Sequence, residues 1–244
     1  ASVMVKTSNL ASAKRGNSSE AFIGVSNPRF NYKRFPGLPT LPSAEEEVAR
    51  ASSLYPQSEL IKNEQATETA LVRGVGRYEI VHIAGHILID GQSPLQSSIL
   101  LAEDLPQATK EKNRNGEASD GTLQAIEIYQ LKLPRTRLVI LSGCQSAVGN
   151  YTQGEALSLL TQAFFASGVP AVIASLWEVD DALSAEIMYS FHYNHRVKHQ
   201  EFGEALSQAL RSLIYESEAK RRHPYYWAAF LLSGHGLDNK VHLN

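Results

Sequence analysis

Five short runs of mostly apolar, often β-branched residues constrain the fold of this chain most strongly. Continuous apolar runs of this kind are typical of strands buried on both faces of a sheet. Helical patterns lie between several of them, and residues 202–214 show the clearest helical period. Strands that alternate with helices predict an α/β sandwich with a mostly parallel sheet. The five runs are residues 79–84, 98–102, 137–142, 170–176 and 230–233.

Length and composition favour one large globular domain or two small ones. The chain has 244 residues, of which 43% are hydrophobic and 20% charged, and this balance excludes a disordered or fibrous chain. Its formal charge of −2 gives no electrostatic reason to expect nucleic acid or a membrane surface as a partner. A single cysteine excludes an internal disulfide and a multi-cysteine zinc site, and it is consistent with a reducing, cytoplasmic compartment.

Polar segments mark the organisation along the chain. Residues 1–20 predict a linker or arm, so that the domain comprises residues 21–244. Ser43 is expected to cap a helix that runs to about Leu54, with acidic residues 45–47 in its first turn. Residues 103–121 are highly charged and predict a long solvated loop. The absence of Met at position 1 is what we expect of an excised domain.

Two of the apolar runs end beside a reactive side chain. One run is followed by Gly85 and His86, and another by Gly143 and Cys144. Ligands of open α/β sheets bind beyond the carboxyl ends of the strands, so we expect the imidazole and the thiol to share one rim. Such a pair can perform acyl transfer, because the imidazole accepts the thiol proton and returns it to a leaving amine. On spacing alone, an inert buried cysteine remains the alternative interpretation.

The other histidines have simpler interpretations. His82 lies inside the same apolar run as His86 and is expected to be a packed core residue. The remaining six show no compact spacing with carboxylates that would indicate a metal site, and we interpret them as surface or packing residues. They are His192, His195, His199, His223, His235 and His242.

Six motifs occur in a distinctive order and spacing between residues 21 and 236. They are VSNP at 25–28, LPTLPSAEEE at 38–47, IVHIAGH at 80–86, LVILSGCQS at 138–146, ASLWEVDD at 174–181 and HPYYWAAF at 223–230. Together they resemble the CHAT domain, a caspase- and separase-like cysteine peptidase module of clan CD that is commonly attached to tetratricopeptide repeats. The resemblance implies a caspase-like three-layer sandwich, in which helices flank a mostly parallel central sheet.

The resemblance also implies roles for individual residues. His86 matches the general base of the family and Cys144 its nucleophile, and the backbone N–H groups of Ile87 and Cys144 match its oxyanion hole. Many members have glycine where this chain has Ile87, and a β-branched residue resists positive φ and would crowd the site. Residues 143–146 look especially like the Gly-Cys-x-Ser setting of separase.

The substrate-binding residues implied by the resemblance lie at the end of the fourth apolar run and just after it. Asp181 matches an acidic residue that would pair with a substrate Arg or Lys, and Asp180, Trp177 and Ser175 lie beside it in the sequence. Helix capping by Asp180 or Asp181 is the alternative for these two carboxylates, and one residue could do each job. The ordinary interpretation of Trp177 is a side chain of the core or of the pocket wall.

The resulting expectation is a cysteine endopeptidase that cleaves a protein or peptide partner after a basic residue and needs no metal or organic cofactor. Tetratricopeptide repeats or another sensor domain are expected before this chain in the full-length protein. The alternative is a catalytically weak binding or regulatory module, which the Ile87 departure favours. A third possibility is an enzyme held inactive until a partner binds, with loop 103–121 and its Lys110, Lys112 and Arg114 as a lid or self-cleavage segment.

Overall fold

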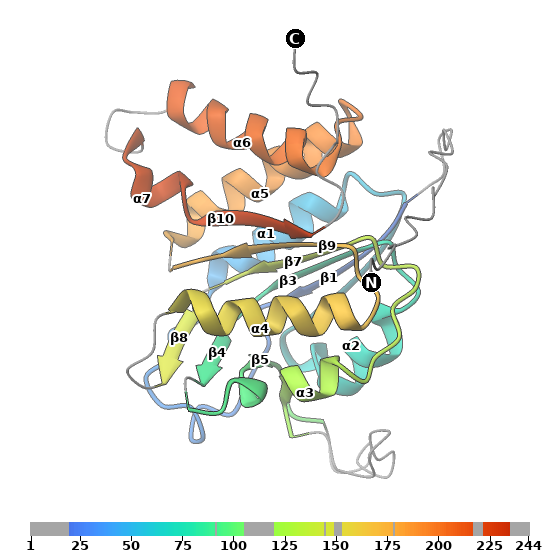
Figure 1. Ribbon diagram of the computed structural model, residues 1–244, viewed down its shortest axis with the longest axis vertical. Coiled ribbons are helices and arrows are strands. Elements are labelled where there is room, and N and C mark those ends of the chain that lie inside the picture. Colours follow the sequence, from blue (N-terminus) through green and yellow to red (C-terminus); the bar gives the residue numbers. More distant parts are fainter. Residues whose placement is uncertain are drawn as a thin grey trace, which may run out of the picture.

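The central element of the structure is a six-stranded, mostly parallel sheet (Figure 1). This computed structural model describes residues 20–90, 92–104, 120–143, 145–148, 153–177, 179–216 and 222–234. The strand order is β10–β9–β7–β3–β1–β2, and only the edge strand β10 runs antiparallel to its neighbour. The strands are β1 (Ala21–Ser26), β2 (Gln57–Lys62), β3 (Ile80–Ala84), β7 (Leu138–Ser142), β9 (Ala171–Ser175) and β10 (Phe230–Gly234).

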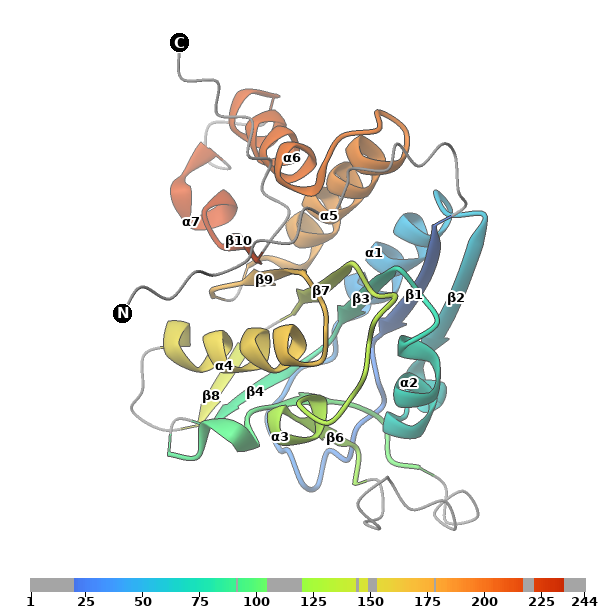
Figure 2. The same ribbon diagram turned by 45° about the vertical axis from the view of Figure 1, so that its right-hand side comes forward.

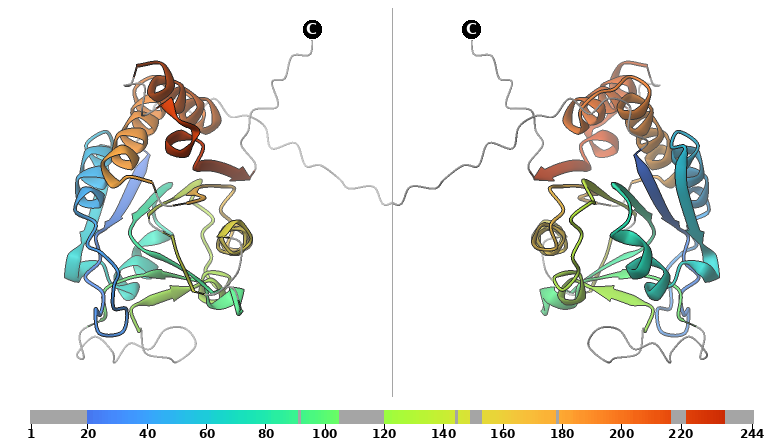
Figure 3. Two further views of the ribbon diagram at one scale, coloured as in Figure 1. Left: turned by 90° about the vertical axis from the view of Figure 1, so that its left-hand side faces the viewer. Right: turned by 90° about the vertical axis from the view of Figure 1, so that its right-hand side faces the viewer.

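Helices cover both faces of this sheet, which confirms the predicted three-layer α/β sandwich (Figures 2 and 3). One face carries α1 (Pro42–Ser52), α5 (Asp181–Arg196) and α6 (Phe202–Glu216). The other face carries α2 (Glu68–Val75), α3 (Ala125–Ile128) and α4 (Gln153–Ala166). The short helix α7 (Pro224–Trp227) leads into β10. In the part of the chain that the structure describes, no helix has the length and apolar character needed to cross a membrane.

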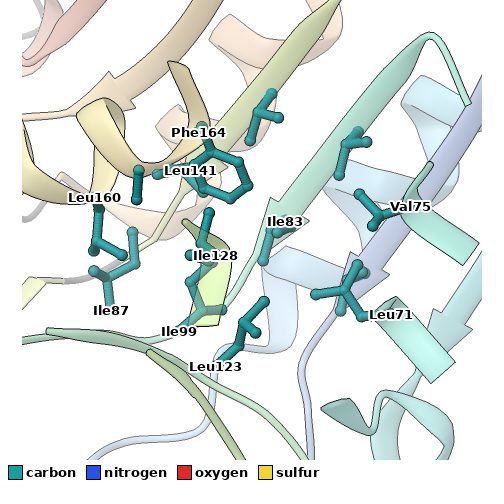
Figure 4. Close-up of a cluster of buried hydrophobic side chains, with 14 of the residues drawn as sticks. Leu71, Val75, Ile83, Ile87, Ile99, Leu123, Ile128, Leu141, Leu160 and Phe164 are labelled. Carbon is teal, nitrogen blue, oxygen red and sulfur yellow. The ribbon is translucent and has the colours of Figure 1, made fainter. Parts of the chain in front are cut away.

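Alternate residues of the central strands belong to opposite layers of the core. Ile83 of β3 and Leu141 of β7 pack in the cluster beside α2, α3 and α4 (Figure 4). Their neighbours Ala84 and Ile140 pack beside α1, α5 and α6. Successive side chains of a strand point to opposite faces, so these runs can be apolar throughout, as the sequence predicts.

A second, four-stranded sheet extends from the first. Its order is β6 (Thr122–Gln124), β5 (Ser98–Leu100), β4 (Ile87–Asp90) and β8 (Gln145–Val148). The apolar run at 98–102 therefore contributes to this sheet and not to the central one. The sequence patterns did not indicate β2, β4, β6 and β8 as strands. Two 3₁₀ turns, Asn63–Gln65 and Pro94–Gln96, complete the described elements.

Candidate active site

The candidate site lies where two parallel strands pass from the central sheet into the second sheet. β3 ends at Ala84 and β4 begins at Ile87, while β7 ends at Ser142 and β8 begins at Gln145. Ala84 pairs with Ser142 and Ile87 pairs with Gln145, so the same separation of 58 positions (142 − 84 and 145 − 87) holds on both sides of the break. Positions 86 and 144 have this separation too. Cys144 itself lies outside the described residues.

His86 occupies this break and is buried, with 3% of its surface exposed. Its Nε2 lies 2.8 Å from the carbonyl oxygen of Pro39, and its ring makes a T-shaped contact with the ring of Phe30. A carbonyl oxygen only accepts hydrogen bonds, so Nε2 carries a proton and the neutral ring has its lone pair on Nδ1. The main chain just before α1 therefore fixes the orientation and tautomer of His86.

Gly143 lies where the backbones that follow β3 and β7 meet. A Cβ atom at Gly143 would lie 1.7 Å from the carbonyl oxygen of Gly85. The missing side chain lets these two backbones come together, and Gly85 N–H donates to Ser142 O at 3.1 Å. The hydroxyl of Ser175 also donates to the carbonyl oxygen of Gly143 at 3.0 Å. The turn before position 144 is thus held by backbone contact and by a side chain from β9.

A small cavity lies beside Gly143 at the carboxyl ends of the central strands. It has about 10 Å³ of space, room for roughly one water molecule. Two of its lining residues, Asp181 and Glu47, are acidic, and none of the lining residues that the structure describes is Lys or Arg. The full lining comprises Leu41, Ala44, Glu47, Ala84, Ser142, Gly143, Ser175, Val179, Asp181 and Ser184.

The neighbouring residues Asp180 and Asp181 have different contacts. Asp180 is exposed and caps α5, because its Oδ1 accepts a hydrogen bond from Leu183 N–H at 3.0 Å. Asp181 is half-buried and lines the cavity, and its Oδ2 accepts from Ser43 N–H at 2.9 Å. Ser43 is therefore not the cap of α1. Leu41 occupies the N-cap position, and Asp181 from another helix binds the first turn of α1 instead.

The remaining predicted site residues lie in different surroundings. Ser175 is buried and lines the cavity. Trp177 does not line it; its indole N–H donates to Tyr225 O at 2.8 Å, and it packs at the edge of the core. Ile87 begins β4, and its side chain lies in the core near Leu160, away from the cavity (Figure 4). Among the described residues, Ile87 is not one of those with positive φ.

Two groups that shape this site are not indicated by the sequence motifs. The carbonyl group of Pro39 belongs to the backbone, so no side-chain pattern indicates its contact with His86. The sequence places Glu47 in the first turn of a helix, and in the structure it is 1% exposed and lines the cavity. Its place among the buried positions Ala44, Val48 and Ala51 of α1 was the available signal.

His82 is a fully buried core residue, as predicted. Within the described part of the chain, His, Asp and Glu side chains form no group of three that could bind a metal ion. Several predicted features lie outside the described residues: positions 1–19 of the expected arm, Glu178, His235 and His242, and positions 105–119 of the charged loop with Lys110, Lys112 and Arg114.

Comparison with solved structures relates this arrangement to known folds. The structure matches the Arg-specific cysteine proteinase gingipain R with a TM-score of 0.53 at 11% identity, covering 88% of this chain and 46% of that one. The separase of Saccharomyces cerevisiae, solved in complex with securin, gives 0.51 at 16% identity over 88% of this chain and 12% of that one. Caspase-1 from Spodoptera frugiperda gives 0.50 at 9% identity over 88% of each chain. These likenesses show a shared fold.

Sequence comparison gives the family. The chain is 28% identical to tetratricopeptide repeat protein 28 from Homo sapiens over 218 residues and 26% identical to the Mus musculus protein over 215 residues. Each match covers 80% of this chain but 8% of the longer relative, so the chain spans a small part of these proteins. The family model of the CHAT domain matches residues 2–235. The chain therefore belongs to the CHAT domain family.

Proposed function

We propose that this domain is a cysteine-type endopeptidase in which His86 is the general base and Cys144 the nucleophile. The observation that carries the proposal is the position of His86 in the break between the two sheets, with its Nε2–H held by Pro39 O. The strand pairing on both sides of that break joins residues with the separation that relates His86 to Cys144. The family membership and the shared fold support the same assignment.

The proposed reaction follows from this chemistry. Nδ1 of His86 accepts the proton of the Cys144 thiol, and the sulfur attacks the carbonyl carbon of the scissile peptide bond. The backbone N–H groups of Cys144 and Ile87 are the proposed donors to the oxyanion. The imidazolium then protonates the leaving amine, the C–N bond breaks, and an acyl-enzyme remains. His86 next takes a proton from water, whose oxygen attacks the acyl carbon; the C–S bond breaks, the carboxylic acid is released, and the sulfur takes the proton back from the imidazolium.

The proposed substrate is a protein partner cleaved after a basic residue. Asp181 lines the cavity beside Gly143, and its carboxylate is the group that would pair with an Arg or Lys side chain. Asp180, Ser175 and Trp177 stay as further proposed contacts. We also propose that tetratricopeptide repeats or another sensor domain precede this domain in the full-length protein, because the curated relatives carry that repeat in their names and are much longer.

A library of peptides with every residue type before the scissile bond tests the proposal. We expect the wild-type protein to cleave after basic residues, and we expect Cys144→Ala and His86→Ala to abolish cleavage. His199→Asn is the matched control, because His199 is exposed, has a positive φ that Asn tolerates, and lies outside the site. Cleavage that survives Cys144→Ala, or no cleavage by the wild type under any condition, contradicts the proposal.

A catalytically weak binding module is the second candidate function. The observation that favours it is the small cavity, which as it stands has no room for a substrate side chain. A peptide that carries a basic side chain and a thiol-reactive group separates the two functions. Labelling of Cys144 that depends on His86 supports the peptidase, whereas tight binding of an unreactive peptide without labelling supports the module.

A further inference from the structure

The cavity beside Gly143 is lined by two carboxylates that come from different helices. Asp181 belongs to α5 and Glu47 to α1. One oxygen of each carboxylate has a partner within the protein: Ser43 N–H donates to Asp181 Oδ2 at 2.9 Å, and His82 Nε2 lies 2.8 Å from Glu47 Oε1. Among the described residues, the second oxygen of each has no recorded partner. Two acidic groups therefore line one small space, and none of its lining residues in the described part of the chain is Lys or Arg.

A chain of buried hydrogen bonds assigns the protons behind Glu47. The hydroxyl of Tyr55 lies 2.8 Å from His192 Nδ1, and His192 Nε2 lies 3.1 Å from His82 Nδ1. Within the described part of the chain, His192 is the one recorded partner of that hydroxyl, so the hydroxyl donates to Nδ1. His192 must then donate from Nε2 to His82, and His82 from Nε2 to Glu47. His192 is neutral in this arrangement, and the chain of hydrogen bonds ends on the carboxylate of Glu47.

The burial of His192 and Tyr55 is consistent with these hydrogen-bond directions. Burial lowers the pKa of His192 well below its ordinary value, so its ring stays neutral. Burial also raises the pKa of Tyr55 well above its ordinary value, so the phenol keeps its proton and remains a donor. The side chain of Glu47 is 2% exposed, so a polar group that reaches its carboxylate leaves water and must find its hydrogen-bond partners there.

We propose that Glu47 is a second specificity-determining residue of this pocket and that, together with Asp181, it binds a guanidinium group in preference to an ammonium group. The proposal rests on the proposed peptidase function and deepens it, because it selects arginine over lysine before the scissile bond. A guanidinium is planar and presents five N–H donors in fixed directions, so it can contact two carboxylates that are held on separate helices. An ammonium is a compact point charge that gains less from a second, separately placed acceptor.

Binding requires the pocket to widen. The present space fits about one water molecule, and Leu41, Ala44 and Val179 form its apolar wall. The hydrogen bond between Asp181 and Ser43 joins the two helices at this wall. We therefore expect an inserted guanidinium to displace the start of α1 from Asp181 and to take over the hydrogen bond that Ser43 N–H makes now.

Two small amines test this inference without the need for cleavage. Agmatine ends in the guanidinium group of arginine and cadaverine in the ammonium group of lysine, and both have a primary amine at the other end. Titration of the whole chain, followed by NMR or calorimetry, gives the ratio of their dissociation constants. We expect the wild type to prefer agmatine and Glu47→Gln to reduce that preference at least fivefold. Asp181→Asn should weaken the binding of both amines.

Glu46→Gln is the matched control, because Glu46 is the preceding residue of the same helix and its side chain is 70% exposed. It should leave both dissociation constants unchanged. Glu47→Gln also alters the buried contact with His82 and can lower stability. The ratio remains informative, however, because both amines sample the same folded molecules.

Specific outcomes overturn the inference. An unchanged agmatine-to-cadaverine ratio in Glu47→Gln, or an equal loss of both affinities, would show that Glu47 only supports the fold. A wild-type protein that binds neither amine contradicts it as well. The peptidase proposal is judged separately, since cleavage that disappears in Cys144→Ala would stand even if the Arg-to-Lys preference did not depend on Glu47.

Discussion

At the scale of single residues, Gly143, which precedes the proposed nucleophile, is the described glycine with the least space for a side chain. A methyl group at this position would lie 1.7 Å from the carbonyl oxygen of Gly85, and the three nearest atoms all belong to the backbone of Gly85, just after the end of β3. Flexible side chains can move away from such a contact, whereas two hydrogen-bonded strands cannot separate locally at low cost. The glycine therefore sets the distance between the segments that carry His86 and Cys144.

We expect Gly143→Ala to destabilise the fold by at least about 2 kcal/mol, because the new methyl group overpacks a backbone contact. Gly76→Ala is the matched control. A Cβ atom there would lie 3.5 Å from Lys132 O, an ordinary contact, and the residue has φ of −71° at the end of α2. Urea denaturation followed by circular dichroism measures both variants. Equal stabilities for Gly143→Ala and Gly76→Ala would contradict this explanation.

At the scale of elements, Glu20 joins the start of β1 to the rest of the fold. Its carboxylate accepts hydrogen bonds from Arg137 at 2.8 Å and Arg196 at 3.2 Å, and it lies 3.0 Å from His195 Nε2. Arg137 precedes β7, and the other two partners end α5. Burial alone would raise the pKa of Glu20, but the hydrogen bond with His195 and the positive charges of His195, Arg137 and Arg196 outweigh it and lower that pKa.

Glu20→Gln should therefore cost about 2 kcal/mol of unfolding free energy near neutral pH, since hydrogen bonds to a charged group are lost. A carboxyl with a lowered folded-state pKa stabilises the fold above its unfolded pKa of about 4.3, and this stabilisation disappears as the pH falls through the folded pKa. The difference between wild type and variant should thus narrow below about pH 4. Urea titrations at several pH values measure it.

Glu64→Gln is the control for that titration, because Glu64 pairs with Arg29 at the surface with both side chains about two-thirds exposed. We expect its effect to stay within about 0.5 kcal/mol at every pH. A difference between wild type and Glu20→Gln that is constant from neutral to acidic pH would mean that the charge of Glu20 does not stabilise the fold.

At the scale of the whole molecule, periodicity in the sequence predicts the layers better than it predicts which sheet a strand joins. The runs at 79–84 and 137–142 become β3 and β7 because both of their faces are buried. The run at 98–102 looks the same but joins the second sheet, since pairing partners far along the chain decide that outcome. Strand β2 is mostly exposed and lacks the apolar run that would have indicated it.

The candidate site, too, was predictable only in part, because contacts between distant parts of the chain complete it. The positions of His86 and Cys144 after two apolar runs indicate one sheet edge, and the family resemblance assigns their roles. The contact between Asp181 and Ser43 and the buried Glu47 depend on how α1 and α5 meet over the sheet. No local pattern encodes an angle between two helices, so these features required the structure.

The two hydrophobic clusters lie on opposite faces of the same strands, and this predicts that the domain unfolds as one unit. Ile140 and Leu141 are consecutive, fully buried residues of β7, and each belongs to a different cluster. Loss of either side chain weakens the shared strand, so Ile140→Ala and Leu141→Ala should each cost about 2–5 kcal/mol of unfolding free energy.

Trp177 and Trp227 pack against the cluster of Ile140 only, so their fluorescence reports directly on that face. We expect Leu141→Ala to shift the fluorescence transition and the circular dichroism transition together; a shift in circular dichroism alone would mean that the faces unfold separately.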